Sequence, residues 1–144
     1  MPESDPLDRL PHAGPARLPD RVLEWAPGVR VVAQRRLGPG DSCLNQAGHL
    51  PSLLLVELMA QVGGLLIEEN GASGRRTGPG LALLAGIKRM HLHDAPRAGE
   101  TVIVEGALVR RLGDVYLIAV SCHTAGRPLA HGRIQIRRAG GSIA

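Results

Sequence analysis

Two polar side chains stand inside an otherwise apolar stretch, and they are the first candidates for chemistry. Leu53–Ile67 contains Glu57 and Gln61 as its only strongly polar residues. A spacing of four places both on one face of a helix. A carboxylate in such surroundings is costly to bury without a partner or a task. We interpret Glu57 as an acid–base candidate rather than a solvated or Arg-paired carboxylate. For Gln61 two roles are equally open: it holds Glu57, or it is a buried amide whose hydrogen bonds go to the backbone.

Histidine supplies the second candidate. His49 precedes Glu57 by eight residues and lies just before the Pro51-Ser52 pair. An imidazole and a carboxyl group together can remove one proton and deliver another. The alternative for His49 is a surface loop residue ahead of a helix.

Other histidines carry weaker signals. His12 either lines a tunnel or caps an N-terminal turn, and we favour the structural role. His91 and His93 alternate, with Asp94 next. Without further clustered ligands this pattern is weak support for a metal site. We therefore predict a solvated strand face and no bound metal.

The element that must position Glu57 is a helix over Ser52–Asn70. Pro51-Ser52 resembles a helix start, and Asn70-Gly71 a stop. The apolar stretch is too short for a membrane span, which needs about 20 residues, so it predicts a buried helix. The Gly63-Gly64 pair costs helix stability, and close packing against a sheet is the favoured reason.

Strand-like runs flank this helix. The segment 20–25 predicts a strand or a short helix, and 29–37 a strand. Four further strands are predicted at 81–91, 101–111, 115–124 and 128–137, the last three separated by hairpin-type turns. This order indicates an α+β fold with an antiparallel sheet wrapped over one helix. We expect a flexible segment at 1–9, one domain at 10–138 and a tail at 139–144.

Composition limits the function classes. The 144 residues fit one domain, and one Trp, one Tyr and no Phe disfavour a base-stacking platform for nucleic acid. The net charge of +4 favours acidic partners, although Arg enrichment from a GC-rich genome explains it equally well. Two cysteines and no signal peptide predict a reduced, cytoplasmic protein. Neither nucleic acid nor membrane is expected as a partner.

Several short motifs now form a recognisable series. In chain order they are Leu10-Pro11-His12, Asp20-Arg21-Val22-Leu23, Gly48-His49-Leu50-Pro51, Leu55-Val56-Glu57-Leu58-Met59-Ala60-Gln61, Leu84-Ala85-Gly86-Ile87-Lys88-Arg89 and Ala98-Gly99-Glu100. Their order and spacing from about residue 10 to residue 137 resemble FabZ-type 3-hydroxyacyl-acyl carrier protein dehydratases. The helix motif with the strand after it is the most specific part.

The resemblance implies a hot-dog fold, in which a long central helix is wrapped by a bent antiparallel sheet. It implies dehydration of a 3-hydroxyacyl thioester, carried on the phosphopantetheine arm of acyl carrier protein, to the trans-2-enoyl thioester without a cofactor. Family members pair side by side as homodimers, which can assemble as trimers of dimers; a heterodimer with another hot-dog subunit is also open. Each site lies at the dimer interface, with a His from one protomer and a Glu from its partner.

Carried over by position, the resemblance makes His49 the base and Glu57 the acid or water-orienting group. Gln61 would hold Glu57 or the water, and the backbone N–H near Ser52 would polarise the thioester carbonyl. His12, Gly63 and Gly64 would line the acyl tunnel.

The loop before the helix departs from the family pattern, because His49 and Glu57 are closer together here. Either His49 is the family histidine on a shortened loop, or Pro51-Ser52 replaces the second "PG" and segment 43–47, which has no His, replaces the His-bearing part. The second reading resembles a short-loop branch in aryl-polyene-type pathways. It leaves open a degenerate hot-dog subunit that binds acyl chains or stabilises an active partner. A hot-dog thioesterase is a further alternative.

Overall fold

Alternation of apolar side chains builds the sheet. Along β5 (Val115–Thr124) every second residue is buried, and the first half of β4 (Thr101–Leu112) repeats the pattern. This period of two is that of a sheet with one covered and one open face. The computed structural model describes residues 5–10, 13–67 and 81–139.

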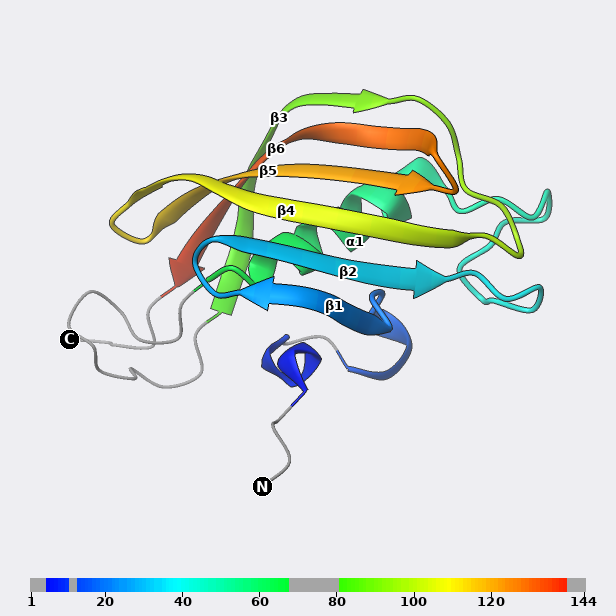
Figure 1. The fold of residues 1–144 in the computed structure, drawn as a ribbon, viewed down its shortest axis with the longest axis horizontal. Coiled ribbons are helices and arrows are strands. Elements are labelled where there is room, and N and C mark those ends of the chain that lie inside the picture. The colour runs from blue at the N-terminus through cyan, green and yellow to red at the C-terminus, as the bar shows by residue number, and fades with distance from the viewer. Residues whose placement is uncertain (1–4, 11–12, 68–80, 140–144) are drawn as a thin grey trace.

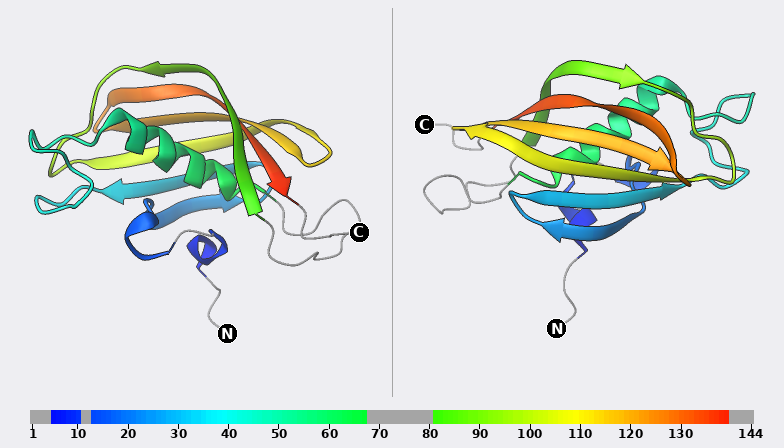
Figure 2. Two further views of the ribbon diagram at one scale, coloured as in Figure 1. Left: turned by 180° about the vertical axis from the view of Figure 1, so that it is seen from behind. Right: turned by 45° about the horizontal axis from the view of Figure 1, so that its top comes forward.

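All strand pairs are antiparallel, in the order β1-β2-β4-β5-β6-β3. The sheet lies toward the viewer in Figure 1 with the helix α1 (Ser52–Gly64) behind it. The reverse view in Figure 2 shows α1 crossing the covered face. The segment 20–25 forms a strand rather than a short helix. The remaining strands are β1 (Arg21–Ala26), β2 (Arg30–Arg36), β3 (Leu81–Leu92) and β6 (Arg127–Ala139).

The helix α1 (Ser52–Gly64) ends earlier than predicted. After Gly64 the chain tightens into i→i−3 hydrogen bonds, the first from Leu65 N–H to the Val62 carbonyl at 3.0 Å. Two adjacent glycines weaken helical propagation here. The carbonyl of Leu65 accepts from Trp25 Nε1 at 2.9 Å, and that of Ile67 from Arg9 at 2.8 Å. The predicted stop at residues 70–71 lies outside the described residues.

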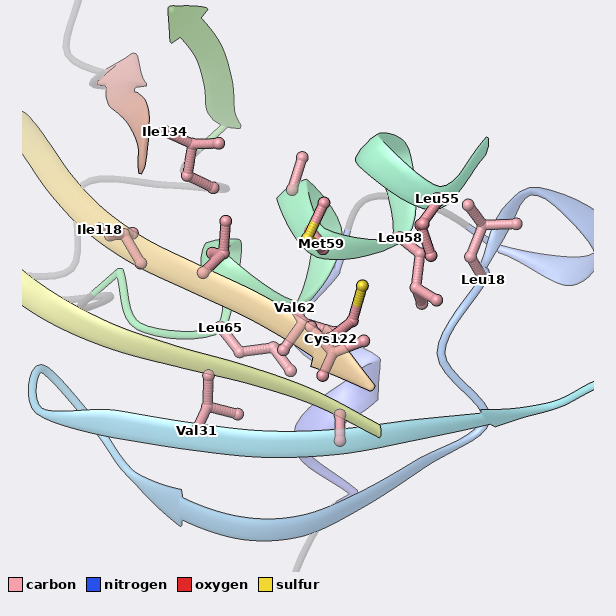
Figure 3. Close-up of a cluster of buried hydrophobic side chains, with 14 of the residues drawn as sticks. Leu18, Val31, Leu55, Leu58, Met59, Val62, Leu65, Ile118, Cys122 and Ile134 are labelled. Atoms are coloured by element: carbon pink, nitrogen blue, oxygen red, sulfur yellow. The ribbon is translucent and has the colours of Figure 1, made fainter. Parts of the chain in front are cut away.

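Apart from the buried Tyr116, the core consists mainly of aliphatic side chains, and α1 supplies its centre (Figure 3). A Cβ added at Gly63 would lie 2.7 Å from Ile134 Cδ1, so the packing prediction is confirmed there. At Gly64 the nearest side chain, Leu10, is 4.0 Å away. Cys122 is buried, and burial raises the pKa of its thiol to about 12, as fits a structural residue.

The packed part of the chain begins before the boundary predicted at residue 10. Pro6–Arg9 forms a short 3-10 helix, and the side chains of Leu7 and Leu10 belong to the core. Burial of these leucines explains why the segment is ordered, since apolar area removed from water offsets ordering entropy. No helix among the described residues has the length and hydropathy to cross a membrane.

Candidate functional site

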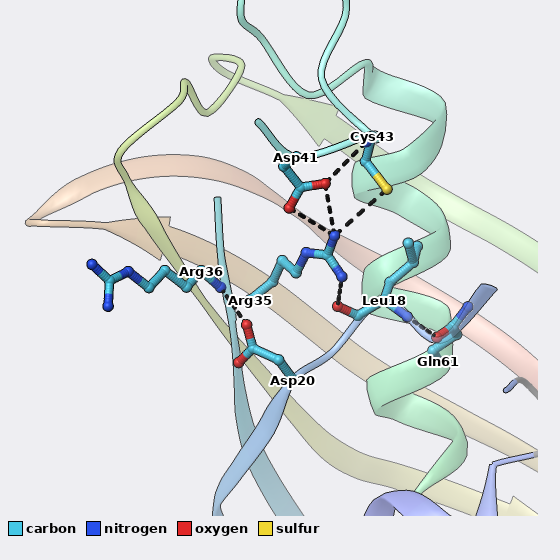
Figure 4. Close-up of polar contacts among 7 residues, drawn as sticks. All are labelled: Leu18, Asp20, Arg35, Arg36, Asp41, Cys43 and Gln61. Carbon is cyan, nitrogen blue, oxygen red and sulfur yellow. Dashed lines mark hydrogen bonds and ion pairs between the residues drawn. The ribbon is translucent and has the colours of Figure 1, made fainter. Parts of the chain in front are cut away.

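Gln61 on α1 forms hydrogen bonds through both ends of its amide, and only 3% of the residue is exposed. Its Oε1 accepts from Leu18 N–H at 2.9 Å, and its Nε2 donates to the Ala16 carbonyl at 2.9 Å and to Glu57 Oε1 at 3.3 Å. Both roles left open by the sequence are therefore present. The amide fastens the N-terminal segment to the helix through Leu18 (Figure 4). It also orients the Glu57 carboxylate, which lies one turn earlier on the helix.

Glu57 lies on the helix face that the N-terminal segment borders, whereas Leu58 and Met59 beside it are buried in the core. Its side chain is half-buried, and one carboxylate oxygen is held by Gln61. A carboxyl group that is fixed by an amide, yet not sealed in the core, can exchange a proton with a molecule bound at this face. The predicted placement of Glu57 and Gln61 on one face of the helix is confirmed.

Hydrogen bonds of its backbone to Asn45 fix the position of His49. Its N–H donates to Asn45 Oδ1 at 3.0 Å and its carbonyl accepts from Asn45 N–H at 2.8 Å. Gly48 adopts a φ of +78°, which permits this turn. His49 also forms a bridge with Arg97 in the loop before β4. Within the described part of the chain, no hydrogen bond joins His49 to Glu57.

A second network, not predicted from the sequence, fastens the loop before α1 to the sheet. Arg35 donates to both carboxylate oxygens of Asp41 at 2.8 Å and to the Leu18 carbonyl at 2.9 Å (Figure 4). Burial raises the pKa of Asp41, but hydrogen bonds from Cys43 N–H and Arg35 outweigh it and lower that pKa overall. The signal in the sequence is a spacing of two, which places Arg35 on the same face of β2 as the buried Val31 and Ala33.

A third network fixes the loop before β4, whose Arg97 forms the backbone bridge with His49. Arg127 donates to both oxygens of Glu100 at 2.9 and 2.8 Å and lies 2.9 Å from Asp94 Oδ2. Hydrogen bonds from Arg127 hold the pKa of Glu100 below its ordinary value. Burial opposes this shift, and a hydrogen bond from Arg97 N–H adds to it. The backbone around His49 is thus held on both sides.

The remaining candidates are dispersed. Ser52 is exposed at the first turn of α1, where backbone N–H groups point out of the helix. His12 lies outside the described residues. His91 and His93 are exposed, as predicted, and each stacks on His131 at 4.9 Å between ring centroids. Among the described residues no cluster of three or more His, Cys, Asp or Glu is arranged to hold a metal ion.

Comparison with known proteins decides the family. The family model for ApeP-like proteins, described as ApeP dehydratase, matches residues 5–140. The chain belongs to the ApeP-like dehydratase family. The predicted FabZ-like relationship and the predicted dehydratase function are confirmed with it.

Curated relatives of this ApeP-like dehydratase carry the FabZ name. The 3-hydroxyacyl-[acyl-carrier-protein] dehydratase FabZ of Ruminiclostridium cellulolyticum is 30% identical over 136 residues, which cover 88% of this chain and 89% of the relative. The FabZ of Bordetella parapertussis is 32% identical over 139 residues, covering 89% and 85%.

A solved structure agrees with this fold. It is described as the dehydratase heterocomplex ApeI:P from Xenorhabdus doucetiae. It matches with a TM-score of 0.81 and 21% identity, over 96% of this chain and 93% of that one. The hot-dog prediction is confirmed, with one helix packed against a six-stranded antiparallel sheet in the described residues.

Proposed function

We propose that this ApeP-like protein dehydrates 3-hydroxyacyl chains carried on acyl carrier protein, with Glu57 as an acid–base group. The observation that carries the proposal is the Gln61–Glu57 pair on α1 in a chain of this family. Two catalytic groups suffice for such a reaction, so no cofactor is needed. The basic net charge of the chain suits an acidic carrier protein.

In the proposed reaction a base removes a proton from C2 of the acyl chain, and an acid protonates the C3 hydroxyl, which leaves as water. We assign the acid to Glu57 and the base to His49. We infer a composite site, because the FabZ-type dehydratases that this chain resembles are expected to build each site from two protomers. A second hot-dog subunit then brings the complementary group to the face that holds Glu57.

Positive charge near the thioester carbonyl would stabilise the enolate that forms when C2 loses its proton. The N–H groups of Ser52 and Leu53 are the candidates for this role, because a helix start leaves its first N–H groups without intrahelical partners. The next two, from Leu54 and Leu55, already donate to the Pro51 carbonyl. Gln61 acts as a positioning residue, since it contacts Glu57 and the protein backbone. His12 and Gly64 remain proposed tunnel residues, whereas the isoleucines that pack directly against Gly63 leave no space beside it for an acyl chain.

Glu57→Gln tests this function, because it removes the ionisable group and keeps the side chain's size. We expect turnover of a 3-hydroxyacyl-acyl carrier protein to fall at least 100-fold, in the range of losing a general acid, measured as formation of the enoyl product by mass spectrometry. Glu24→Gln is the control and should retain full activity. Glu24 pairs with Arg30 on the surface, and its side chain is 64% exposed.

Unchanged turnover in Glu57→Gln would exclude Glu57 as the acid. The same assay separates the competing activity. Release of free carrier thiol without enoyl product by the wild-type protein would identify a thioesterase instead. These two results are independent, since one concerns a residue and the other the reaction.

A second candidate function is a hot-dog subunit that serves an active partner. The specific observation is the edge strand β3, whose outer side is unpaired within the described chain and which exposes Leu83, Leu84, Ile87 and Leu92. A related solved structure is described as a heterocomplex of dehydratases. An open, apolar strand edge favours pairing with another chain. Turnover that appears only after co-expression with a second hot-dog subunit would support this candidate; full activity of a purified homo-oligomer would exclude it.

A further inference from the structure

The open face of the sheet, opposite α1, carries a pocket of about 470 Å³. This face of the sheet is the one turned toward the viewer in Figure 1. The residues that line the pocket come from five strands, β2 to β3 in sheet order. Its volume falls within the range of small-molecule sites. The helix face that carries Glu57 is on the other side of the sheet, so this pocket is separate from the proposed dehydration site.

Strand register explains why the face is hollow. One cross-strand row runs from Arg30 through Ala107, Ala119 and Arg133 to Lys88 on the edge strand. The two alanines are small, whereas the members on either side of them are long and cationic. Side chains in such a row stand side by side on one face. The small residues therefore form a floor, and the arginines form the rims.

A neighbouring row adds polar groups. It runs from Glu105 through Ser121 and His131 to His91. Arg30 already pairs with Glu105 at 3.0 Å, so that end of the pocket is balanced. The middle again has a short side chain, Ser121, which extends the floor and supplies a hydroxyl group.

The positive charge at the end of the pocket near β3 is not balanced by a carboxylate within the described residues. Arg89 and Arg133 line the pocket and are exposed. Within the described chain neither guanidinium forms an ion pair or hydrogen bond. Two permanent positive charges therefore face one pocket without a carboxylate partner. A guanidinium without a partner suits a phosphate or carboxylate, which it can bind through two parallel hydrogen bonds.

The backbone of β3 is distorted to make this arrangement. A bulge shifts the register between Lys88 and His91, so that His91 rather than Met90 stands opposite His131. Arg89 within the bulge adopts a φ of 50°, a left-handed conformation that is unfavourable for a non-glycine residue. Such strain is found preferentially at functional sites.

Glycine on the facing strand accommodates that bulge. A Cβ added at Gly132 would lie 2.8 Å from Met90 Cα, a backbone atom that cannot turn aside. Gly132 thus lets β3 approach β6 closely enough to place Arg89 and His91 at the rim. The pocket depends on a specific combination of bulge, glycine and small floor residues rather than on surface charge alone.

We propose that this pocket binds a small organic phosphate, with Arg89 and Arg133 holding the phosphate group. The floor of Ala107 and Ala119 would contact the apolar or planar body of the ligand. The volume of the pocket and the short side chains of its floor favour a ligand of nucleotide size rather than the surface of another protein. This inference does not depend on the dehydratase reaction.

Titration of the full chain, with any co-purifying subunit retained, tests the proposal. The probes are AMP, adenosine and inorganic phosphate, followed by calorimetry. We expect AMP to bind, adenosine to bind at least 10-fold more weakly, and phosphate to compete with AMP. A dissociation constant for AMP weaker than about 10 mM would overturn the proposal.

Variants locate the site. Arg89→Gln/Arg133→Gln should weaken AMP binding at least 10-fold, whereas Arg21→Gln, an exposed arginine on β1 outside the pocket, should leave it unchanged. Denaturation of each variant checks the fold. Equal weakening by Arg21→Gln would show general charge attraction and contradict the proposal, as would unchanged binding in the double variant.

Discussion

Gln61 shows how one buried side chain can serve both stability and chemistry. It satisfies a buried backbone donor and an acceptor from a segment more than forty residues away in sequence, and it holds Glu57. Arg35 plays a similar part for the loop before α1. Both residues position groups of the candidate site through contacts with backbone.

Replacing Gln61 by Leu should lower the free energy of unfolding by about 1–3 kcal/mol, because the buried Leu18 N–H loses its acceptor. Urea denaturation measures this difference. Gln46→Leu, in an exposed loop, is the matched control and should change stability by less than about 0.5 kcal/mol. Equal effects of the two changes would contradict the anchoring role.

Asp41 gives the loop before α1 a pH-dependent anchor. The pKa of Asp41 is lower in the folded protein than its ordinary value of 3.8. A lowered pKa means that the carboxylate stabilises the fold above pH 3.8 and that this contribution is lost as pH falls through the folded pKa.

Asp41→Asn should therefore lower stability by about 1.5–3 kcal/mol at neutral pH, the range for hydrogen bonds to charged groups. The gap from the wild type should shrink as the pH falls below 3.8. Denaturation midpoints across this pH range measure it. A gap that stays constant down to the lowest pH would mean that Asp41 is not the titrating group.

The helix α1 is held against the sheet by a small residue at the closest contact. Gly63 faces Ile134, Ile136 and Ile118, whereas Gly64, one residue on, has room beside it. Two neighbouring glycines thus have different reasons to be glycine. Local sequence does not distinguish them, because the difference lies in the strands opposite.

Gly63→Ala should be less stable than Gly64→Ala by about 1–3 kcal/mol, since the first overpacks the core and both gain helix propensity of about 1 kcal/mol. Thermal or chemical denaturation ranks the two. In the Gly63→Ala background, Ile134→Val should cost less than in the wild type, because Val lacks the Cδ1 atom at 2.7 Å. An unchanged cost would contradict the proposed clash.

Among the described residues the sheet ends in two edge strands, β1 and β3, and its two faces differ. One face is covered by α1 and the N-terminal segment; the other bears the cationic pocket. The edge strand β3 carries apolar side chains 42–51% exposed, among them Leu84 and Ile87. These features suit a protein that functions with a second subunit.

Leu84→Lys/Ile87→Lys should weaken association through β3, because charge on an open strand edge opposes pairing. Light scattering coupled to size exclusion measures the mass, and we expect at least a 10-fold weaker self- or hetero-association. Leu112→Lys, 67% exposed at the β4–β5 hairpin, is the control. A mass that responds equally to both variants would exclude β3 as the interface.

The amino-acid sequence determined the strands, the central helix, the candidate pair Glu57 and Gln61, and the family. Hydrophobic period and short motifs are local properties, so they can be read without the fold. The tertiary structure decided how the chain is held after α1, the contact of Arg35 with the Leu18 carbonyl and the alignment of His91 with His131. The first two depend on partners distant in sequence, and the third depends on strand register. No local pattern encodes these contacts.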